Sequence, residues 1–230
     1  MTIIPRKQIR TLTALTLALA LNASAVVVYD NSITDLETRV AIGSGLTIGD
    51  EITLTPGPER YLTDFSFEYY LLNNGSGIGS PVGAPLVTVS FYLNDGPLFN
   101  GYATPSTALW TSTPFALTLL TERQTLNYNA SDFGGEPIFV PVDSFTWAVS
   151  ISGLGAGDEF GLDVYGPVAV GSSFPDYWQN SGGSWALLAS ELPINFAAKF
   201  EAVVPEPSTA VFAILGGLGL FVASRRWRKS

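Results

Sequence analysis

The 230-residue chain contains no cysteine and no histidine. Without cysteine it has neither disulfide bonds nor a thiol nucleophile. Without histidine it lacks the commonest zinc ligand and the base of a Ser-His-Asp triad. We therefore expect no cofactor and no metal centre. Paired carboxylates are the one catalytic arrangement that this composition leaves open, and the protein is not expected to be an enzyme.

Charged residues are scarce, at 13% of the chain, and basic residues are almost missing from its middle. Residues 26–204 contain 4 Lys and Arg against 19 Asp and Glu, a net charge of 4 − 19 = −15. Such an acidic body lacks the basic footprint that nucleic-acid binding requires, and it is unsuited to anionic lipid. Solubility outside the cell is the simplest account of this charge.

Helical periodicity is missing between residues 26 and 203, where short runs of alternating apolar and polar residues predict strands instead. In the segment 144–152, Phe145 and Trp147 face in whereas Thr146 and Ala148 face out. Gly49 and Asp50 are expected to lie between two short strands, 39–42 and 51–54. Ten to twelve strands with frequent Gly and Pro turns predict an all-β fold, an antiparallel two-sheet sandwich that is jelly-roll-like.

The first 25 residues have the layout of a secretory signal peptide, which we expect to be helical. Basic residues at positions 6, 7 and 10 precede an apolar run over 12–21, and Ala23-Ser24-Ala25 follows it. We expect signal peptidase of the general secretion machinery to cut between Ala25 and Val26. The run of about ten residues is short for a membrane span, and an uncleaved anchor is the alternative.

The last 27 residues combine a short polar motif, an apolar segment and a basic end. Pro205, Glu206 and Pro207 precede an apolar run, and we expect a transmembrane helix over about 209–223. Such a helix spans roughly 22 Å against a hydrocarbon core of about 30 Å, so it is marginally short. The basic tail contains Arg225, Arg226, Arg228 and Lys229, which predict a cytoplasmic C-terminus and a body outside the cytoplasm. A plain anchor and a buried core helix are the alternatives.

This tail resembles the PEP-CTERM sorting signal of exported bacterial proteins, and the resemblance covers residues 204–229. It implies recognition of Pro205, Glu206 and Pro207 by an exosortase, a membrane-embedded cysteine protease. It also implies a Gram-negative-type envelope, an exopolysaccharide-producing cell and a transient stay in the inner membrane before the body reaches the cell surface or matrix. The resemblance says nothing about the activity of the body. Together with the signal peptide, it divides the chain into three expected domains: the signal peptide 1–25, the β-sandwich 26–203 and the sorting signal 204–230.

Two acidic segments are the candidate sites for chemistry in the body. Asp158 and Glu159 precede a strand that carries Asp163, and a glycosidase needs two carboxylates flanking the bond that it cuts. Asp95 and Asp158 lie in turns where calcium would find oxygen ligands, although neither has the spacing of a calcium loop. Ordinary Asx turns explain both aspartates more simply.

Aromatic residues gather in the segment 172–185, which the sequence predicts to be a loop. Tyr177, Trp178 and Trp185 stand there among amide and carboxylate side chains, a combination that suits sugar rings. Capping of the sandwich core is the competing account of these aromatics. The preferred hypothesis is a structural or adhesive surface protein among exopolysaccharide, and the alternatives are a carbohydrate-binding module and a carboxylate-dependent polysaccharide hydrolase.

Overall fold

The alternating runs form strands, and the computed structural model describes them over residues 24–189 and 192–204. Within these residues it contains sixteen strands and no helix, so the all-β prediction is confirmed. The count exceeds the predicted ten to twelve because four strands have only two residues each. The strands are β1 Val26–Asp30, β2 Asp35–Ile42, β3 Leu46–Thr53, β4 Tyr61–Asn73, β5 Leu86–Tyr92, β6 Leu98–Phe99, β7 Tyr102–Ala103, β8 Ala108–Thr111, β9 Phe115–Ala116, β10 Thr121–Asn129, β11 Ile138–Phe139, β12 Ser144–Ser152, β13 Asp158–Tyr165, β14 Ser172–Ser181, β15 Ser184–Leu188 and β16 Ala198–Val203.

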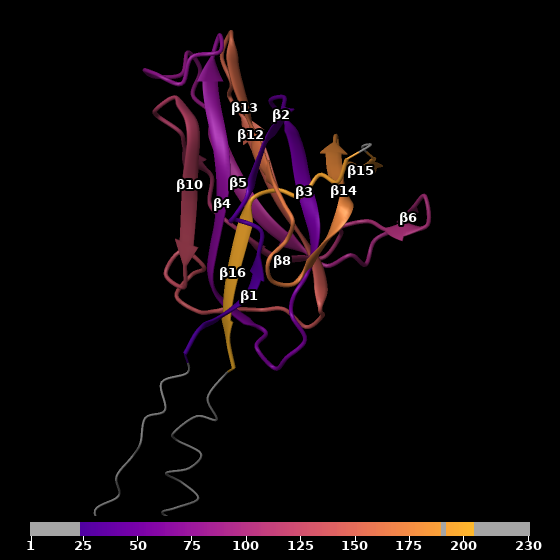
Figure 1. Cartoon of the computed structure of the whole chain (residues 1–230). Helices are drawn as coiled ribbons and strands as arrows, with labels where there is room; N and C mark the ends of the chain where they lie inside the picture. Colours follow the sequence, from indigo (N-terminus) through magenta and orange to yellow (C-terminus); the bar gives the residue numbers. More distant parts are fainter. Residues whose placement is uncertain (1–23, 190–191, 205–230) are drawn as a thin grey trace, which may run out of the picture. The chain divides into compact units, whose positions relative to one another are not determined.

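Two seven-stranded antiparallel sheets contain almost all of these strands (Figure 1). The first sheet has the order β1-β16-β4-β13-β2, and β10 and β11 also pair with β4. The second has the order β15-β14-β3-β12-β5-β8, and β9 also pairs with β5. Because β2, β4, β10, β13 and β16 alternate along the chain with strands of the other sheet, the connections cross repeatedly between the two layers.

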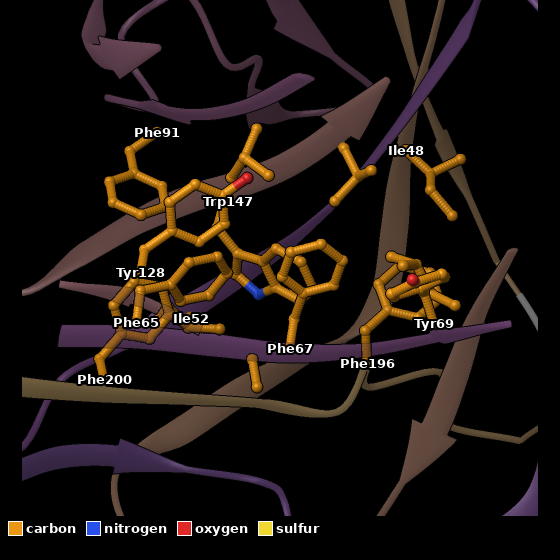
Figure 2. Packing of buried hydrophobic residues seen from close by; sticks show 14 of the residues in the cluster. Ile48, Ile52, Phe65, Phe67, Tyr69, Phe91, Tyr128, Trp147, Phe196 and Phe200 are labelled. Atoms are coloured by element: carbon orange, nitrogen blue, oxygen red, sulfur yellow. The ribbon is translucent and has the colours of Figure 1, made fainter. Parts of the chain in front are cut away.

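Aromatic rings from both sheets meet in the space between them and form the core (Figure 2). Phe65 of β4 is central, with ring centroids 5.1 Å from Phe91 and 5.3 Å from Trp147 in the opposite sheet. Within its own sheet it packs on Phe200 of β16 at 4.5 Å. The predicted inward positions Phe145 and Trp147 are fully buried, so the period of two in β12 identified the core face correctly.

The opposite face of β12 differs from the prediction, because Thr146 and Ala148 are buried as well. Ala148 lies opposite Gly49 of β3, and Gly49 lies opposite the buried Trp178 of β14. A Cβ on Gly49 would come within 2.9 Å of Ala148, so only glycine fits this position. Glycine at this position thus lets β3 and β12 approach closely, and Trp178 is buried outside the main core cluster.

Gly49 and Asp50 lie inside β3, contrary to the prediction that they separate two strands. The continuous strand pairs with β12 from Thr47 to Thr53, including the pair Asp50–Trp147. Local propensity fails here because tertiary contacts occupy both positions: Gly49 lies against Thr146 and Ala148 of β12, and the Asp50 carboxylate has buried hydrogen-bond donors.

A short arm formed by β6 and β7 projects from the second sheet, on the right of Figure 1. It replaces the simple turn that Asn94-Asp95-Gly96-Pro97 predicts. Leu93 and Ser106 bond through their backbones at its base, and Asn100 and Gly101 adopt positive φ at its tip. The two-stranded arm is separate from both main sheets.

The first and last strands of the described domain lie side by side (Figure 1). β1 pairs with β16 antiparallel, with Val26 opposite Ala202. Val203, the last residue of β16, pairs with Tyr61 of β4. The chain therefore enters and leaves this domain at neighbouring points.

Candidate functional site

Most residues of the predicted targeting segments lie outside the described residues. These are Ala23 of the signal-cleavage site, the motif residues Pro205, Glu206 and Pro207, the expected helix over 209–223, and the basic residues Arg225, Arg226, Arg228 and Lys229. Ala25 and Val26 are described, and Val26 begins β1. Within residues 24–189 and 192–204 no helix is long and apolar enough to cross a membrane.

The predicted aromatic loop 172–185 is instead a hairpin of β14 and β15 with a turn at Gly182 and Gly183. β14 pairs with β3, and a bulge between Ser173 and Tyr177 interrupts the pairing. The loop prediction is wrong, because proline and glycine within this segment do not end the strand pairing. In the structure the proline lies in the bulge and the glycines lie in the tight turn.

The hairpin does not place Tyr177, Trp178 and Trp185 on one surface. Tyr177 packs inward against Phe196, with ring centroids 5.6 Å apart. Trp178 lies on the other face, where it is fully buried and its indole N–H donates to Glu51 at 3.4 Å. Trp185 is half-buried and packs edge-on against Tyr92 at 5.7 Å. Sugar binding stays a prediction, but the Trp178 ring is inaccessible to a ligand in this structure.

Trp185 lines a cleft between the β6–β7 arm and the β14–β15 turn. The cleft has a volume of about 470 Å³. Its arm side includes Leu98, Phe99 and Thr104, and its hairpin side includes Ser184 and Trp185. The arm was not predicted, so the sequence named Trp185 as a possible sugar-binding residue, which stays a prediction, but not the wall that faces it.

Asp158 holds two loops together, and hydrogen-bond donors of the protein already occupy both of its carboxylate oxygens. Its carboxylate accepts backbone N–H bonds from Val82 at 3.0 Å, Gly83 at 2.7 Å and Gly155 at 2.8 Å, and a side-chain bond from Asn73 at 2.9 Å. Desolvation opposes ionisation, but these four donors outweigh it and lower the pKa of Asp158 to about 2. This residue therefore remains ionised and structural at any physiological pH.

Glu159 and Asp163 also have protein partners. Glu159 accepts a hydrogen bond from the Tyr70 hydroxyl at 2.9 Å. Asp163 is 1% exposed and forms an ion pair with Arg39 of β2 at 3.1 Å. Burial raises the pKa of Asp163, although Arg39 acts in the opposite direction. The arrangement explains why β13 tolerates a carboxylate at the centre of a sheet.

Asp95, the other calcium candidate, closes the base of the arm. It accepts bonds from the backbone N–H and hydroxyl of Thr107 at 2.9 and 2.6 Å. The hydroxyl bond from Thr107 lowers the pKa of Asp95. Among the described residues there is no cluster of three or more acidic side chains placed to hold a metal ion.

Asp50 is a buried carboxyl group that sequence reasoning missed. It is fully inaccessible, and it accepts bonds from the Ser173 hydroxyl at 2.7 Å and the Phe196 backbone N–H at 3.0 Å. Desolvation raises its pKa well above the ordinary value, although the two donors oppose this. The Gly-Asp dipeptide is a common turn signal, so the sequence offers no hint that this aspartate joins β3, β14 and the segment before β16.

Asp50 makes stability depend on pH in a direction opposite to that of most carboxylates. Because its pKa is raised in the folded protein, the folded state binds a proton more tightly than the unfolded state does. The stability that Asp50 contributes is fully present below pH ~4, the pKa of the group in the unfolded chain, and is lost as pH rises through its pKa in the folded protein. In the wild type, the Asp50 carboxyl group should make the free energy of unfolding fall as pH rises, by at most about 1.4 kcal/mol per pH unit. We expect Asp50→Asn to lack this fall.

Urea unfolding between pH 4.5 and 8 measures this decline. Asp95→Asn is the matched control, because the Asp95 pKa is lowered and its contribution changes only at lower pH. Equal slopes for the wild type and Asp50→Asn would contradict the assignment.

The described residues thus define the class of the body, an antiparallel all-β domain of two packed sheets. The end of the chain is more specific, because residues 203–229 match the model of the PEP-CTERM protein-sorting motif. This motif supports an exported protein with a C-terminal sorting signal that an exosortase processes. No curated protein and no solved structure matches the chain. The motif match begins at Val203, which is also the last residue of β16.

Proposed function

We propose that this chain is a cell-surface or extracellular-matrix protein with a structural or adhesive role among exopolysaccharide. The observation that carries the proposal is the PEP-CTERM motif at residues 203–229. The acidic composition of residues 26–204 supports it, because such a body remains soluble and does not associate with nucleic acid. The repeated crossing between two sheets adds to this support, since it provides a durable scaffold without disulfides.

The targeting steps follow the order of the chain. Signal peptidase removes residues 1–25 after secretion, and the apolar segment 209–223 holds the protein in the inner membrane. The basic residues from Arg225 to Lys229 keep the C-terminus in the cytoplasm. Exosortase then acts near Pro205, Glu206 and Pro207, and the body passes to the surface. Both cuts fall close to strands that pair with each other, β1 and β16, so neither removes part of the core.

The proposed role of the body is non-catalytic. Three carboxylates that sequence analysis considered for hydrolysis or calcium binding have protein partners: Asp158 has four donors, Glu159 has Tyr70 and Asp163 has Arg39. A general acid or base needs access to substrate, whereas these groups stabilise loops and strands. Binding through Trp185 is the second candidate function, because this ring lines a cleft.

Deletion of the gene in the producing bacterium tests the proposed role. We expect the mutant cells to release exopolysaccharide into the medium that wild-type cells retain, at least twofold more per cell. Total polysaccharide in washed cells and in supernatant measures the effect, and complementation with the wild-type gene is the control. Equal retention by mutant and wild-type cells would rule out the structural role.

A further inference from the structure

We propose that the cleft between the β6–β7 arm and the β14–β15 turn binds a neutral polysaccharide chain. The inference rests on the proposed function, since it assumes that the body meets exopolysaccharide, and it specifies the site and the ligand class. It depends on four properties of the cleft: its size, its mixed surface, its charge and its rigidity.

The cleft has the size and composition of a small-molecule site. Its volume of about 470 Å³ lies within the range of roughly 300–1,000 Å³ for ligand pockets. Trp185 and Phe99 are half-buried and supply aromatic surface. The neighbouring Leu98 is 72% exposed and adds apolar surface to the cleft. A sugar ring would cover these groups with its C–H face.

Polar groups beside the rings suit the hydroxyls of a sugar. Thr104, Ser106 and Ser184 line the cleft and present hydroxyl groups. Thr104 donates to the Pro97 carbonyl at 2.8 Å. Over the part of the chain that the structure describes, the hydroxyls of Ser106 and Ser184 have no protein partner, and both residues are exposed. Each can donate one hydrogen bond and accept two.

The charge of the cleft selects neutral over anionic glycans. Lys and Arg are absent from the residues that line it within the described chain. The ionised Asp95 lies at the base of the arm, next to Gly96, whose added Cβ would contact both Thr104 and Ser106. A uronic acid or a sulfated sugar would find no compensating cation among the lining residues, in a body whose net charge is 4 − 19 = −15.

Both walls of the cleft are held in place without a ligand. Asp95 bonds twice to Thr107 at the base of the arm, and Tyr102 packs edge-on against Phe174 of β14 at 4.9 Å. On the hairpin side, Tyr92 supports the Trp185 ring at 5.7 Å. Preorganised walls lower the entropy cost of binding, which matters for a flexible polysaccharide.

A peptide is the competing occupant, and the geometry favours it less. A peptide that extends the second sheet at β15 would need backbone hydrogen bonds along Ser184–Leu188. The cleft contacts only Gly183, Ser184 and Trp185 at the beginning of that strand. Side-chain hydroxyls and rings, rather than a free backbone edge, are therefore the groups that a ligand meets.

Affinity electrophoresis of the full chain, purified in mild detergent, tests the proposal. The probes are galactomannan, laminarin and dextran as neutral polysaccharides, alginate as an anionic one, and a proline-free, strand-forming decapeptide as competitor. We expect the wild type to bind at least one neutral probe, and Trp185→Ala to weaken its Kd roughly tenfold, equivalent to about 1.4 kcal/mol. Leu98→Ala should weaken it about threefold, which corresponds to roughly 0.6 kcal/mol.

Phe139→Ala is the matched control, because Phe139 is an aromatic residue, 50% exposed, that does not line the cleft. It should leave the Kd within about twofold of the wild type. Thermal unfolding checks that each variant is folded. If Trp185→Ala fails to fold, Leu98→Ala decides, since the exposed Leu98 side chain contributes little to the core.

Three results would overturn the proposal: no binding of any neutral probe, alginate binding as tight as neutral binding, or unchanged affinity in the folded cleft variants. Displacement of the sugar by the decapeptide would assign the cleft to a peptide instead. Failure here is distinguishable from failure of the proposed function. If gene deletion releases exopolysaccharide but the cleft binds no sugar, only the cleft proposal is rejected. If the cleft binds sugar but gene deletion has no effect, only the proposed surface role is rejected.

Discussion

Replacement of Pro205, Glu206 and Pro207 by alanine is expected to leave the protein uncut in the inner membrane. The three residues form the polar part of the PEP-CTERM motif, which the chain matches over residues 203–229. Each proline ring restricts its own backbone and that of the residue before it, and Glu206 supplies the one charge of the motif; three alanines remove both features. The apolar segment and the basic tail remain in this variant, so insertion into the membrane should persist. We expect processing to fall from nearly complete to undetectable.

Fractionation with an antibody against the body, and intact-mass measurement of the recovered protein, give the result directly. A Glu136→Ala, Pro137→Ala double variant is the matched control, because it removes the same residue types, an exposed glutamate and a half-buried proline, from the body. It should be processed like the wild type. Normal processing of the triple variant, or retention of Trp227 in the wild-type surface protein, would refute the role of the motif.

Replacement of Phe65 by alanine is expected to destabilise the domain by about 3–5 kcal/mol, the usual cost of deleting a large buried ring. Phe65 is 1% exposed and lies where the two sheets meet (Figure 2). Its ring centroid lies between 4.5 and 6.0 Å from five others, those of Phe67, Phe91, Tyr128, Trp147 and Phe200. Rigid rings that surround a cavity relax little, so we expect the upper part of this range.

Urea unfolding monitored by tryptophan fluorescence measures this loss. Phe65→Leu should cost only about 1–2 kcal/mol, because leucine restores most of the volume. Phe139→Ala, on an exposed aromatic residue, should cost less than about 1 kcal/mol. A loss below that value for Phe65→Ala would mean that the two sheets do not pack through this ring.

The strands and their core faces were largely predictable, because a period of two is a local property of the sequence. Phe145 and Trp147 alternate with small or polar residues, and the structure buries both between the sheets. Sheet order was not predictable. It depends on pairings such as β1 with β16, whose partners are more than 160 residues apart.

In the candidate site too, local features could be predicted from the sequence whereas long-range contacts could not. Trp185 was identified from its aromatic and amide neighbours in the sequence, and it does line a cleft. Its opposing wall comes from Leu98 and Phe99, about 85 positions earlier, in a segment that reads locally as a turn. Trp178, a sequence neighbour, is buried because β14 continues as a strand and directs alternate side chains to opposite faces. The sequence prediction therefore placed Trp178 and Trp185 in one site because they are close in sequence, whereas the hairpin buries Trp178 and leaves Trp185 at the cleft.

The sequence alone determined the all-β class, the acidic character of the body and the sorting motif, because alternation, net charge and a contiguous motif need no knowledge of distant contacts. Only the tertiary structure decided that Asp50 is buried among donors from two other segments, that Gly49 lies against β12, and that an arm faces Trp185 across a cleft. Each of these features depends on which strands become neighbours. That choice arises from the packing of two whole sheets, and no local window of the chain contains it.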